Sequence, residues 1–262
     1  MNDLPTITAG PVRVEIDPKA GGRIAQITVG DNPLLVGRDG AGGDPLAWGA
    51  YPMVPWAGRI RGGRFEFRGV AYELPRNHGG HAMHGVGYAS AWTVTTHTAA
   101  RIDLRLDLPT DATWPFGGIV LQAFEVSERS VTATMSVTAT ERAFPVSFGW
   151  HPWFRKPSRL DFAPTAMYRR DEDNIAVDEL VDVPPGPWDD CFVNVEPIGM
   201  TIDGVDLRLT SPCTDWVVYD VPAHATCVEP QTGPPDAFTI RQVTVEPRAT
   251  VTTTFRLEVT NT

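Results

Sequence analysis

The stretch Arg101-Ile-Asp-Leu-Arg-Leu-Asp-Leu108 alternates polar and apolar residues without a break. Successive side chains of a β-strand point to opposite faces, so this pattern predicts a strand with four apolar side chains on one face. A strand that is apolar on one face only is typical of an antiparallel sheet that packs on a core. The stretch therefore predicts an antiparallel sheet with one buried face.

The same alternation continues toward the C-terminus. It recurs from Ser130 to Thr140 and again near the end of the chain, with apolar faces made by Val131, Ala133, Met135, Val137 and Ala139, and by Val251, Phe255, Leu257 and Val259. Asp203-Gly204 lies between two further runs and is typical of a two-residue hairpin turn. No segment of 11 or more residues shows a convincing helical period, and 24 Gly with 24 Pro would interrupt most helices. We expect an all-β protein of large antiparallel sheets with little helix.

Composition limits the domain organisation and the partners. The 262 residues are 42% hydrophobic, which is enough for a sizeable core, and no linker, charge block or repeat divides them. We therefore expect a single domain over residues 1-262. The net charge of −10 argues against nucleic-acid or anionic-membrane partners, because binding phosphates needs clustered Lys and Arg. A neutral small molecule fits better.

The cysteines and the N-terminus indicate a cellular compartment. Cys191, Cys213 and Cys227 match neither a disulfide framework nor a zinc-ligand spacing, so they are expected to be thiols in a reducing compartment. The first residues lack the basic and apolar regions of a secretory signal, and no run of about 18 apolar residues occurs. These features predict a cytoplasmic protein.

The segment Thr226-Cys-Val-Glu-Pro-Gln-Thr-Gly-Pro-Pro-Asp-Ala-Phe238 places Glu229 at the end of an apolar run. Pro230 biases Glu229 toward an extended conformation, and Gly233-Pro234-Pro235 predicts a turn where the strand ends. A carboxylate on a rigid strand end can act as a general base, because proton transfer needs heavy atoms held at hydrogen-bond distance. The alternative is a strand-terminal glutamate in solvent.

A histidine in an aromatic segment is the natural partner for such a base. His151 lies in Phe-Gly-Trp-His-Pro-Trp-Phe, residues 148–154, where the rigid apolar surroundings can shift its pKa. The aromatic rings beside it suit the apolar faces of a sugar. A packed core histidine is the alternative.

Three more segments place polar groups among Gly, Pro and aromatic residues. Arg59 follows Trp-Ala-Gly, where its guanidinium could reach a ligand hydroxyl or carboxylate. The segment that begins at Asn77 holds three histidines, but it lacks helical spacing and a nearby acidic or thiol ligand, so we expect no metal there. We expect His84, beside Gly85, to face a ligand. Asp189 and its neighbour Asp190 lie in a Pro-rich loop, where solvated turn acids are the alternative.

Five stretches together resemble one known family. Pro-Trp-Ala-Gly-Arg-Ile (55–60), Met-His-Gly (83–85), His-Pro-Trp-Phe (151–154), Asp-Asp-Cys-Phe (189–192) and Val-Glu-Pro-Gln (228–231) are similar, in this order, to aldose 1-epimerase (galactose mutarotase-like) motifs. The resemblance implies a galactose-mutarotase-like β-supersandwich. It also implies a mutarotase that interconverts the α and β anomers of a free monosaccharide, with no cofactor and no metal, as a monomer or homodimer.

The resemblance also implies roles for individual residues. Glu229 would take the proton of the anomeric hydroxyl, His151 would protonate the ring oxygen, and His84 would assist there. We expect an ionised Glu229 and a His151 whose modestly raised pKa keeps it protonated. The implied substrate-binding residues are Arg59, Asp189, Trp153 and Asn77.

Departures from the family pattern leave the sugar open. Gly58 stands where many relatives have Asn, Val86 where they have a second Gly, and Trp153 where Tyr or Phe is more familiar. One alternative is a hexose-6-phosphate 1-epimerase, for which Arg61, Arg64 and Arg76 would supply cations. The other alternative is a non-catalytic sugar-binding or sensor module, because a fold does not determine a function.

Overall fold

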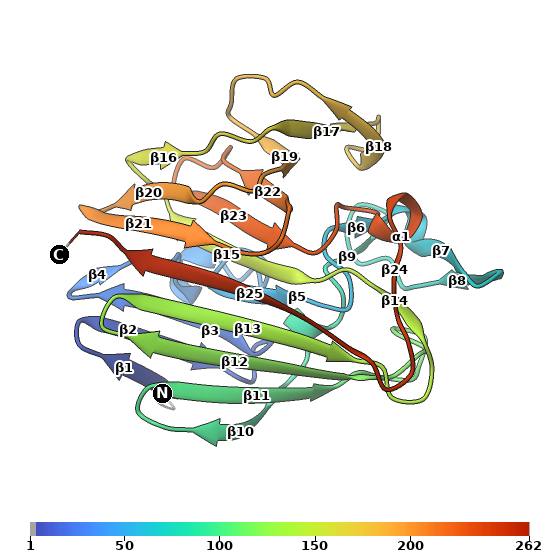
Figure 1. Ribbon diagram of the computed structural model, residues 1–262, viewed down its shortest axis with the longest axis horizontal. Coiled ribbons are helices and arrows are strands. Elements are labelled where there is room, and N and C mark those ends of the chain that lie inside the picture. Colours follow the sequence, from blue (N-terminus) through green and yellow to red (C-terminus); the bar gives the residue numbers. More distant parts are fainter. Residues whose placement is uncertain (1–3, 262) are drawn as a thin grey trace.

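The protein, described here by a computed structural model over residues 4–261, consists of two large antiparallel sheets (Figure 1). The larger sheet has eleven strands, of which ten follow one another edge to edge and the eleventh, β4 (Asn32–Pro33), pairs with β3. In spatial order the ten are β1 (Thr6–Ala9), β2 (Val12–Asp17), β3 (Arg23–Val29), β5 (Ala50–Met53), β15 (Gly149–Arg155), β23 (Ala225–Gln231), β22 (Asp215–Tyr219), β19 (Asp189–Val193), β17 (Ala166–Arg170) and β18 (Ala176–Val181).

The second sheet has eight strands and packs against the first. In spatial order they are β10 (Thr93–His97), β11 (Arg101–Asp107), β12 (Ile119–Ser127), β13 (Ser130–Thr138), β25 (Thr250–Val259), β21 (Val205–Thr210), β20 (Ile198–Ile202) and β16 (Arg159–Asp161). Trp150 of β15 donates from its indole to Gln122 of β12 at 3.1 Å, so one hydrogen bond joins the two sheets inside the core.

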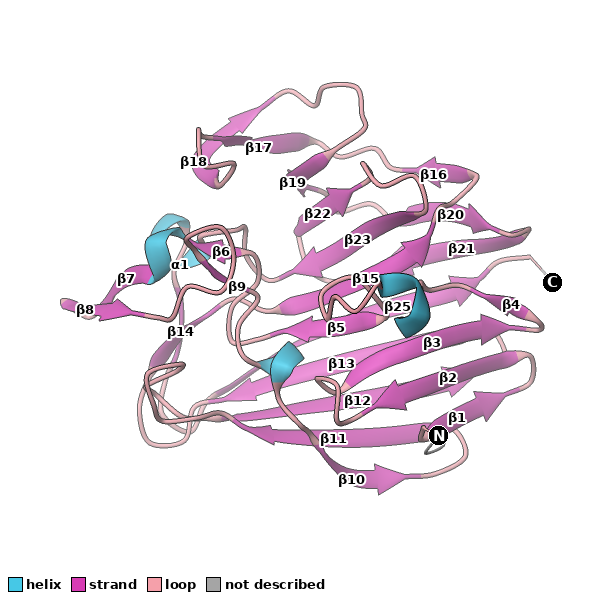
Figure 2. Ribbon diagram, turned by 180° about the vertical axis from the view of Figure 1, so that it is seen from behind, coloured by secondary structure: helices cyan, strands magenta, loops and turns pink. Residues whose placement is uncertain are grey.

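Short two-stranded pairs lie beside one end of the two large sheets (Figure 2). Three two-stranded pairs are β6 (Arg59–Ile60) with β9 (Ala82–Met83), β7 (Arg64–Phe67) with β8 (Val70–Glu73), and β14 (Phe144–Val146) with β24 (Val243–Val245). The helices are single turns: η1 (Arg38–Ala41), η2 (Arg61–Gly63), η3 (Gly87–Ala89) and α1 (Ala237–Ile240). Over the described residues, no helix has the length and apolar character needed to cross a membrane.

The all-β prediction is confirmed, and so are its individual strands. The Arg101–Leu108 stretch forms β11, and its four apolar side chains are all buried. The runs at 130–140 and 251–259 form β13 and β25, which pair with each other. Asp203 and Gly204 both have positive φ and join β20 to β21, as the hairpin signal predicted.

Glu229 does not lie at the end of its strand, which corrects one expectation. β23 continues through Pro230 to Gln231, and it is a central strand between β15 and β22. β15 and β23 pair at Gly149↔Gln231 and again at Trp153↔Cys227, and the ladder is interrupted between these points. Both Pro152 and Pro230 lie in the interval, and neither has an N–H to donate. Pro230 can therefore lie in a central strand, because the interval of β15 that it faces contains a second proline, Pro152, and the ladder is interrupted there.

The close approach of β15 to β23 depends on Gly149. A Cβ at this position would lie 2.0 Å from the carbonyl oxygen of Pro230, which no backbone can accommodate without moving. We expect Gly149→Ala to lower the free energy of unfolding by about 3 kcal/mol, because the added atom must push two central strands apart. Urea unfolding measures this difference.

Gly37→Ala is the matched control. Its added Cβ meets nothing within 4 Å and its φ is −77°, so we expect a change within about 0.5 kcal/mol. Equal stability of Gly149→Ala and Gly37→Ala would contradict the close approach of the two strands.

Candidate active site

One row of side chains crosses the centre of the larger sheet. Tyr51 of β5 lies opposite His151 of β15, and Val217 of β22 lies opposite Glu229 of β23. The pairs on either side of the interrupted ladder put His151 directly opposite Glu229. Residues that face each other across neighbouring strands point to the same side of a sheet. Tyr51, His151, Glu229 and Val217 therefore share one face.

The next row along the strands repeats this arrangement. Trp153, Cys227, Tyr219 and Asp189 are paired in turn across β15, β23, β22 and β19. Side chains two residues apart on a strand point to the same side, so both rows form one floor. The intervening residues, such as Trp150, point to the other side and join the core between the sheets. The alternation of the strands thus separates the core from a polar and aromatic floor.

Loops close a cavity of about 510 Å³ over this floor. Its walls come from residues 44–47, from the β6 to β9 region, and from Pro235 after β23. Figure 2 shows these loops in front of the central strands. The volume lies within the range of about 300–1,000 Å³ that is usual for small-molecule sites. The cavity is lined by residues of both rows and by Arg59, Asn77 and His84.

His151 and Glu229 are in direct contact at the bottom of the cavity. His151 Nε2 lies 3.2 Å from Glu229 Oε1, and the two residues are only 7% and 2% exposed. Gln231 donates from Nε2 to the other carboxylate oxygen, Oε2, at 3.3 Å. The carboxylate is therefore held from both sides, and a solvated glutamate at this position is excluded.

Burial opposes charge on both members of this pair. It lowers the pKa of His151 to about 3, and it raises the pKa of Glu229 well above its ordinary value, with the nearby charge of Asp189 adding to the increase. The expectation of a raised His151 pKa is therefore wrong, because removing the imidazolium from water outweighs any stabilisation by its neighbours. The raised pKa of Glu229 likewise runs against the expectation of an ionised carboxylate, because burial disfavours the charged form of each side chain.

His84 lies against the same pair. Its ring is edge-on to that of His151, with centroids 5.2 Å apart. Its backbone N–H donates to the Gly58 carbonyl and its Nδ1 accepts from the Gly58 N–H, so a neutral ring carries its proton on Nε2. Burial, followed by the charges of His151 and Arg59, lowers its pKa well below the usual value. His84 is thus a neutral donor beside the acid–base pair.

The other two histidines of this segment do not join it as ligands of one metal. His81 Nδ1 accepts from the Gly62 N–H at 3.2 Å, and the backbones of His78 and His81 are hydrogen-bonded to each other. Across residues 4–261, the ligand atoms of His78, His81 and His84 form no convergent group.

Arg59 and Asp189 differ in whether another side chain is already paired with the charged group. The Arg59 guanidinium lines the cavity and makes no hydrogen bond or ion pair with another residue in the described chain. Asp189 also lines the cavity, and its carboxylate lies 3.5 Å from Arg170. Asp190 is outside the cavity lining and binds Arg170 at 2.8 Å. Arg59 and Asp189 are therefore the charged groups available to a ligand.

Trp153 and Asn77 both reach the cavity but in different ways. The Trp153 ring lies beside His151 with a centroid separation of 5.6 Å and an angle of 14°. The Asn77 amide donates to the Met83 carbonyl and the Tyr88 hydroxyl and accepts from the Met83 N–H. Its polar atoms hold the wall of the cavity, so its proposed contact with substrate remains a prediction.

Unsatisfied polar atoms are concentrated on this floor. Within residues 4–261, four buried side-chain nitrogen or oxygen atoms have no hydrogen-bond partner: Tyr51 Oη, His151 Nδ1, Trp153 Nε1 and Gln231 Oε1. Such atoms are rare in native proteins because each one costs free energy. All four belong to residues that line the cavity over the floor, which favours this face of the sheet as the functional one.

Three floor residues were missed by the sequence analysis. Gln231 lies two residues after Glu229 on an extended segment, so period-two alternation could have placed it on the same face. Tyr51 comes from β5, whose neighbour β15 is distant in the chain, so no local signal marks it. Tyr219 comes from β22, which is followed in the chain by its neighbour β23, and it pairs there with Cys227.

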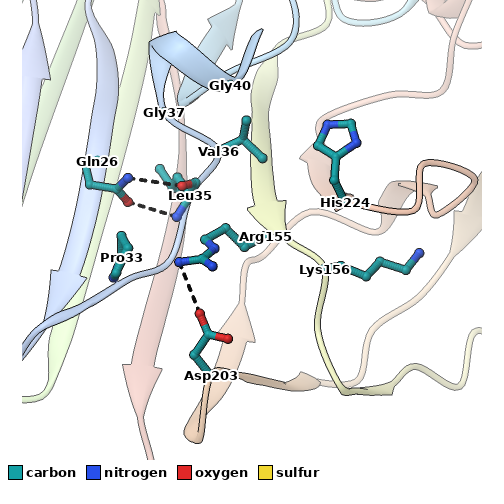
Figure 3. A pocket seen from close by; sticks show the side chains of 10 residues that line it. All are labelled: Gln26, Pro33, Leu35, Val36, Gly37, Gly40, Arg155, Lys156, Asp203 and His224. Carbon is teal, nitrogen blue, oxygen red and sulfur yellow. Dashed lines mark hydrogen bonds and ion pairs between the residues drawn. The ribbon is translucent and has the colours of Figure 1, made fainter.

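A second cavity of about 550 Å³ lies at the far end of β15 (Figure 3). Arg155 is paired there with Asp203 at 3.2 Å, and the Gln26 amide makes two hydrogen bonds with the Leu35 backbone. Lys156 is paired with Asp220 at 2.7 Å. Because these groups already have partners, the cavity above Glu229 is the better candidate site.

Comparison with known proteins agrees with this geometry. The aldose 1-epimerase family model matches residues 5–239. Two uncharacterized proteins of Escherichia coli K12 are similar in sequence. YphB is 29% identical over 153 residues, which are 57% of this chain and 51% of YphB. YihR is 26% identical over 227 residues, which are 74% of this chain and 73% of YihR. The chain thus spans about half the length of YphB.

Solved structures show the same fold at low sequence identity. An Escherichia coli K12 protein superimposes with a TM-score of 0.85 at 20% identity over 98% of both chains. The GalM/aldose epimerase homologue of Caenorhabditis elegans gives 0.84 at 15% identity over 98% of this chain and 99% of its own. Galactose 1-epimerase of Lactobacillus acidophilus gives 0.82 at 14% identity over 97% and 92%. With its galactose-mutarotase-like fold and a family match over nearly its whole length, the chain belongs to the aldose 1-epimerase family.

Proposed function

We propose that the protein is a mutarotase that interconverts the α and β anomers of a free aldose. The observation that carries the proposal is the buried contact of 3.2 Å between His151 Nε2 and Glu229 Oε1 in a sugar-sized cavity. Opening the sugar ring removes a proton from the anomeric hydroxyl and delivers one to the ring oxygen. These two oxygens share one carbon, so the two proton carriers must lie side by side.

The reaction needs one proton on the pair formed by Glu229 and His151, so that one group can act as the acid and the other as the base. The opposed pKa shifts of Glu229 and His151 favour one proton on the pair near neutral pH. Moving that proton from Glu229 to His151 along their contact creates the base and the acid. Sugar hydroxyls that donate to Glu229 favour this transfer, as does the positive charge of Arg59, which lowers the Glu229 pKa.

The steps then follow from the positions of the groups. Glu229 takes the proton of the anomeric hydroxyl while His151 protonates the ring oxygen, assisted by the Nε2–H of His84. The open aldehyde turns about the bond from C1 to C2. On closure His151 takes its proton back from the hydroxyl that re-forms the ring, and Glu229 returns its proton to the anomeric oxygen. Arg59 and Asp189 hold other hydroxyls and Trp153 packs on the sugar. Cytoplasmic location and a monomeric or dimeric state remain predictions.

The charges favour a free sugar over a phosphorylated one. The cations considered for a phosphate are already paired, Arg61 with Asp171 at 2.6 Å, and Arg64 and Arg76 with Glu73 at 3.4 and 3.1 Å. Within the described lining, Arg59 is the one arginine, and its positive charge already acts to lower the pKa of the Asp189 and Glu229 carboxyls. A phosphate dianion would meet more negative than positive charge.

Removing either proton carrier should abolish catalysis without unfolding the protein. We expect Glu229→Gln and His151→Asn each to lower the rate by about 100-fold or more, since each positioned acid or base contributes roughly 100- to 10,000-fold. Polarimetry of freshly dissolved α-glucose and α-galactose measures the rate, and circular dichroism checks the fold.

Glu196→Gln, an exposed carboxylate, is the control and should keep the full rate. Full activity in Glu229→Gln would remove the base assignment. Sugar binding by the unaltered protein with no acceleration of either sugar would favour the sensor function instead.

A comparison of substrates separates the two epimerase functions. We expect faster anomerisation of glucose than of glucose 6-phosphate, because the paired arginines leave no cation cluster for the phosphate. Anomer-resolved NMR exchange measures both rates under the same conditions. A strong preference for the phosphorylated sugar would establish the alternative.

The protonation state of His151 can be measured directly. Because burial places its pKa near 3, the ring should stay neutral from pH 5 to pH 8, and its NMR resonances should shift little over that range. A spectrum of His151→Asn assigns the ring among the six histidines. A titration midpoint near the ordinary value of about 6.5 would contradict the burial effect.

A further inference from the structure

Three potential metal ligands converge on the floor of the cavity. The ligand atoms of His151, Cys227 and Glu229 all lie within 4.8 Å of one another, and they form the one such group of three in residues 4–261. All three residues are buried. Cys227 packs in a small hydrophobic cluster with Tyr51 and Trp153, and the proposed acid–base mechanism does not use its thiol.

The sheet itself brings these ligands together. Cys227 and Glu229 are two residues apart on β23, so they point to the same side, and His151 lies opposite Glu229 on β15. Two rigid central strands thus supply all three groups without any loop. The separation of 3.2 Å between His151 and Glu229 already suits adjacent ligands of one metal. Metal–ligand distances of about 2.0–2.3 Å then require only a small movement of the thiol.

The donor set selects a class of metal. A thiolate with an imidazole and a carboxylate favours zinc and similar transition metals over magnesium or calcium, which prefer oxygen ligands alone. His151 Nδ1 has no hydrogen-bond partner, so no hydrogen bond to that nitrogen fixes the ring against the slight rotation that ligation requires.

We propose that His151, Cys227 and Glu229 form a binding site for Zn²⁺ or a similar divalent transition metal. The metal enters from the cavity, whose lining includes His151 and Glu229, and its fourth position faces the cavity. Binding releases the Cys227 thiol proton and the proton shared by the pair to solvent. A bound metal occupies both proton carriers, so it excludes the acid–base reaction and competes with the sugar.

Cobalt binding tests the site without any reliance on catalysis. We expect one equivalent of Co²⁺ to give tetrahedral visible bands and a thiolate charge-transfer band in the near ultraviolet. The charge-transfer band should disappear in Cys227→Ser, and Zn²⁺ affinity should fall by more than about tenfold in both Cys227→Ser and His151→Asn. Cys191→Ser is the matched control, because Cys191 is also a buried thiol with a raised pKa but has no ligand partners.

The cobalt experiment has results that support the metal site and results that overturn it. Loss of the band in Cys227→Ser with its retention in Cys191→Ser supports the site. No stoichiometric metal binding, or a thiolate band that persists in Cys227→Ser, overturns it. Should Cys227→Ser fold poorly, Cys227→Ala with unchanged circular dichroism serves in its place.

Inhibition gives a second readout that rests on the proposed function. Zn²⁺ should slow mutarotation by the unaltered protein, and a chelator should restore the rate. The ratio of rates with and without Zn²⁺ should approach one in Cys227→Ala. Failure of mutarotation with intact cobalt binding would reject the proposed function while leaving the metal site in place.

Discussion

The pairing of β15 with β23 is the constraint on which the rest of the structure depends. Pro152 and Pro230 interrupt the ladder from both sides in the same interval, while the pairs at its two ends keep the strands in register. His151 and Glu229 therefore lie opposite each other on rigid central strands. One face of the same strands closes the core with Trp150, and the other face carries the cavity floor. A slip of one residue would exchange the two faces.

The pairing of polar side chains also differs between the cavity floor and the rest of the described chain. Most arginines outside the cavity have carboxylate partners, and buried Arg23 donates to the carbonyls of several segments. On the floor, by contrast, Tyr51, His151, Trp153 and Gln231 each leave a buried polar atom without a partner. Stability would favour satisfying these atoms, so their concentration at one place indicates that function determines their arrangement.

Burial explains why one pair of residues can serve proton transfer and also attract a metal. In water, glutamate and histidine would each hold their usual charge, whereas burial in this cavity disfavours both charges. The proposed divalent cation would instead balance the negative charges of the Glu229 carboxylate and of the Cys227 thiolate that ligation produces. A sugar and a metal thus compete for one set of groups, and the fold alone does not select between them.

The sequence by itself determined the all-β class, the strands around Arg101–Leu108 and 130–140, the hairpin at Asp203-Gly204, and the segments that hold Glu229, His151, His84, Arg59 and Asp189. These follow from alternation and turn chemistry, which are local properties. Only the tertiary structure decided that β5, β15, β23 and β22 are neighbours, and hence that Tyr51, Tyr219, Gln231 and Cys227 join the floor. It also reversed the expected pKa of His151, because burial depends on residues far apart in the chain.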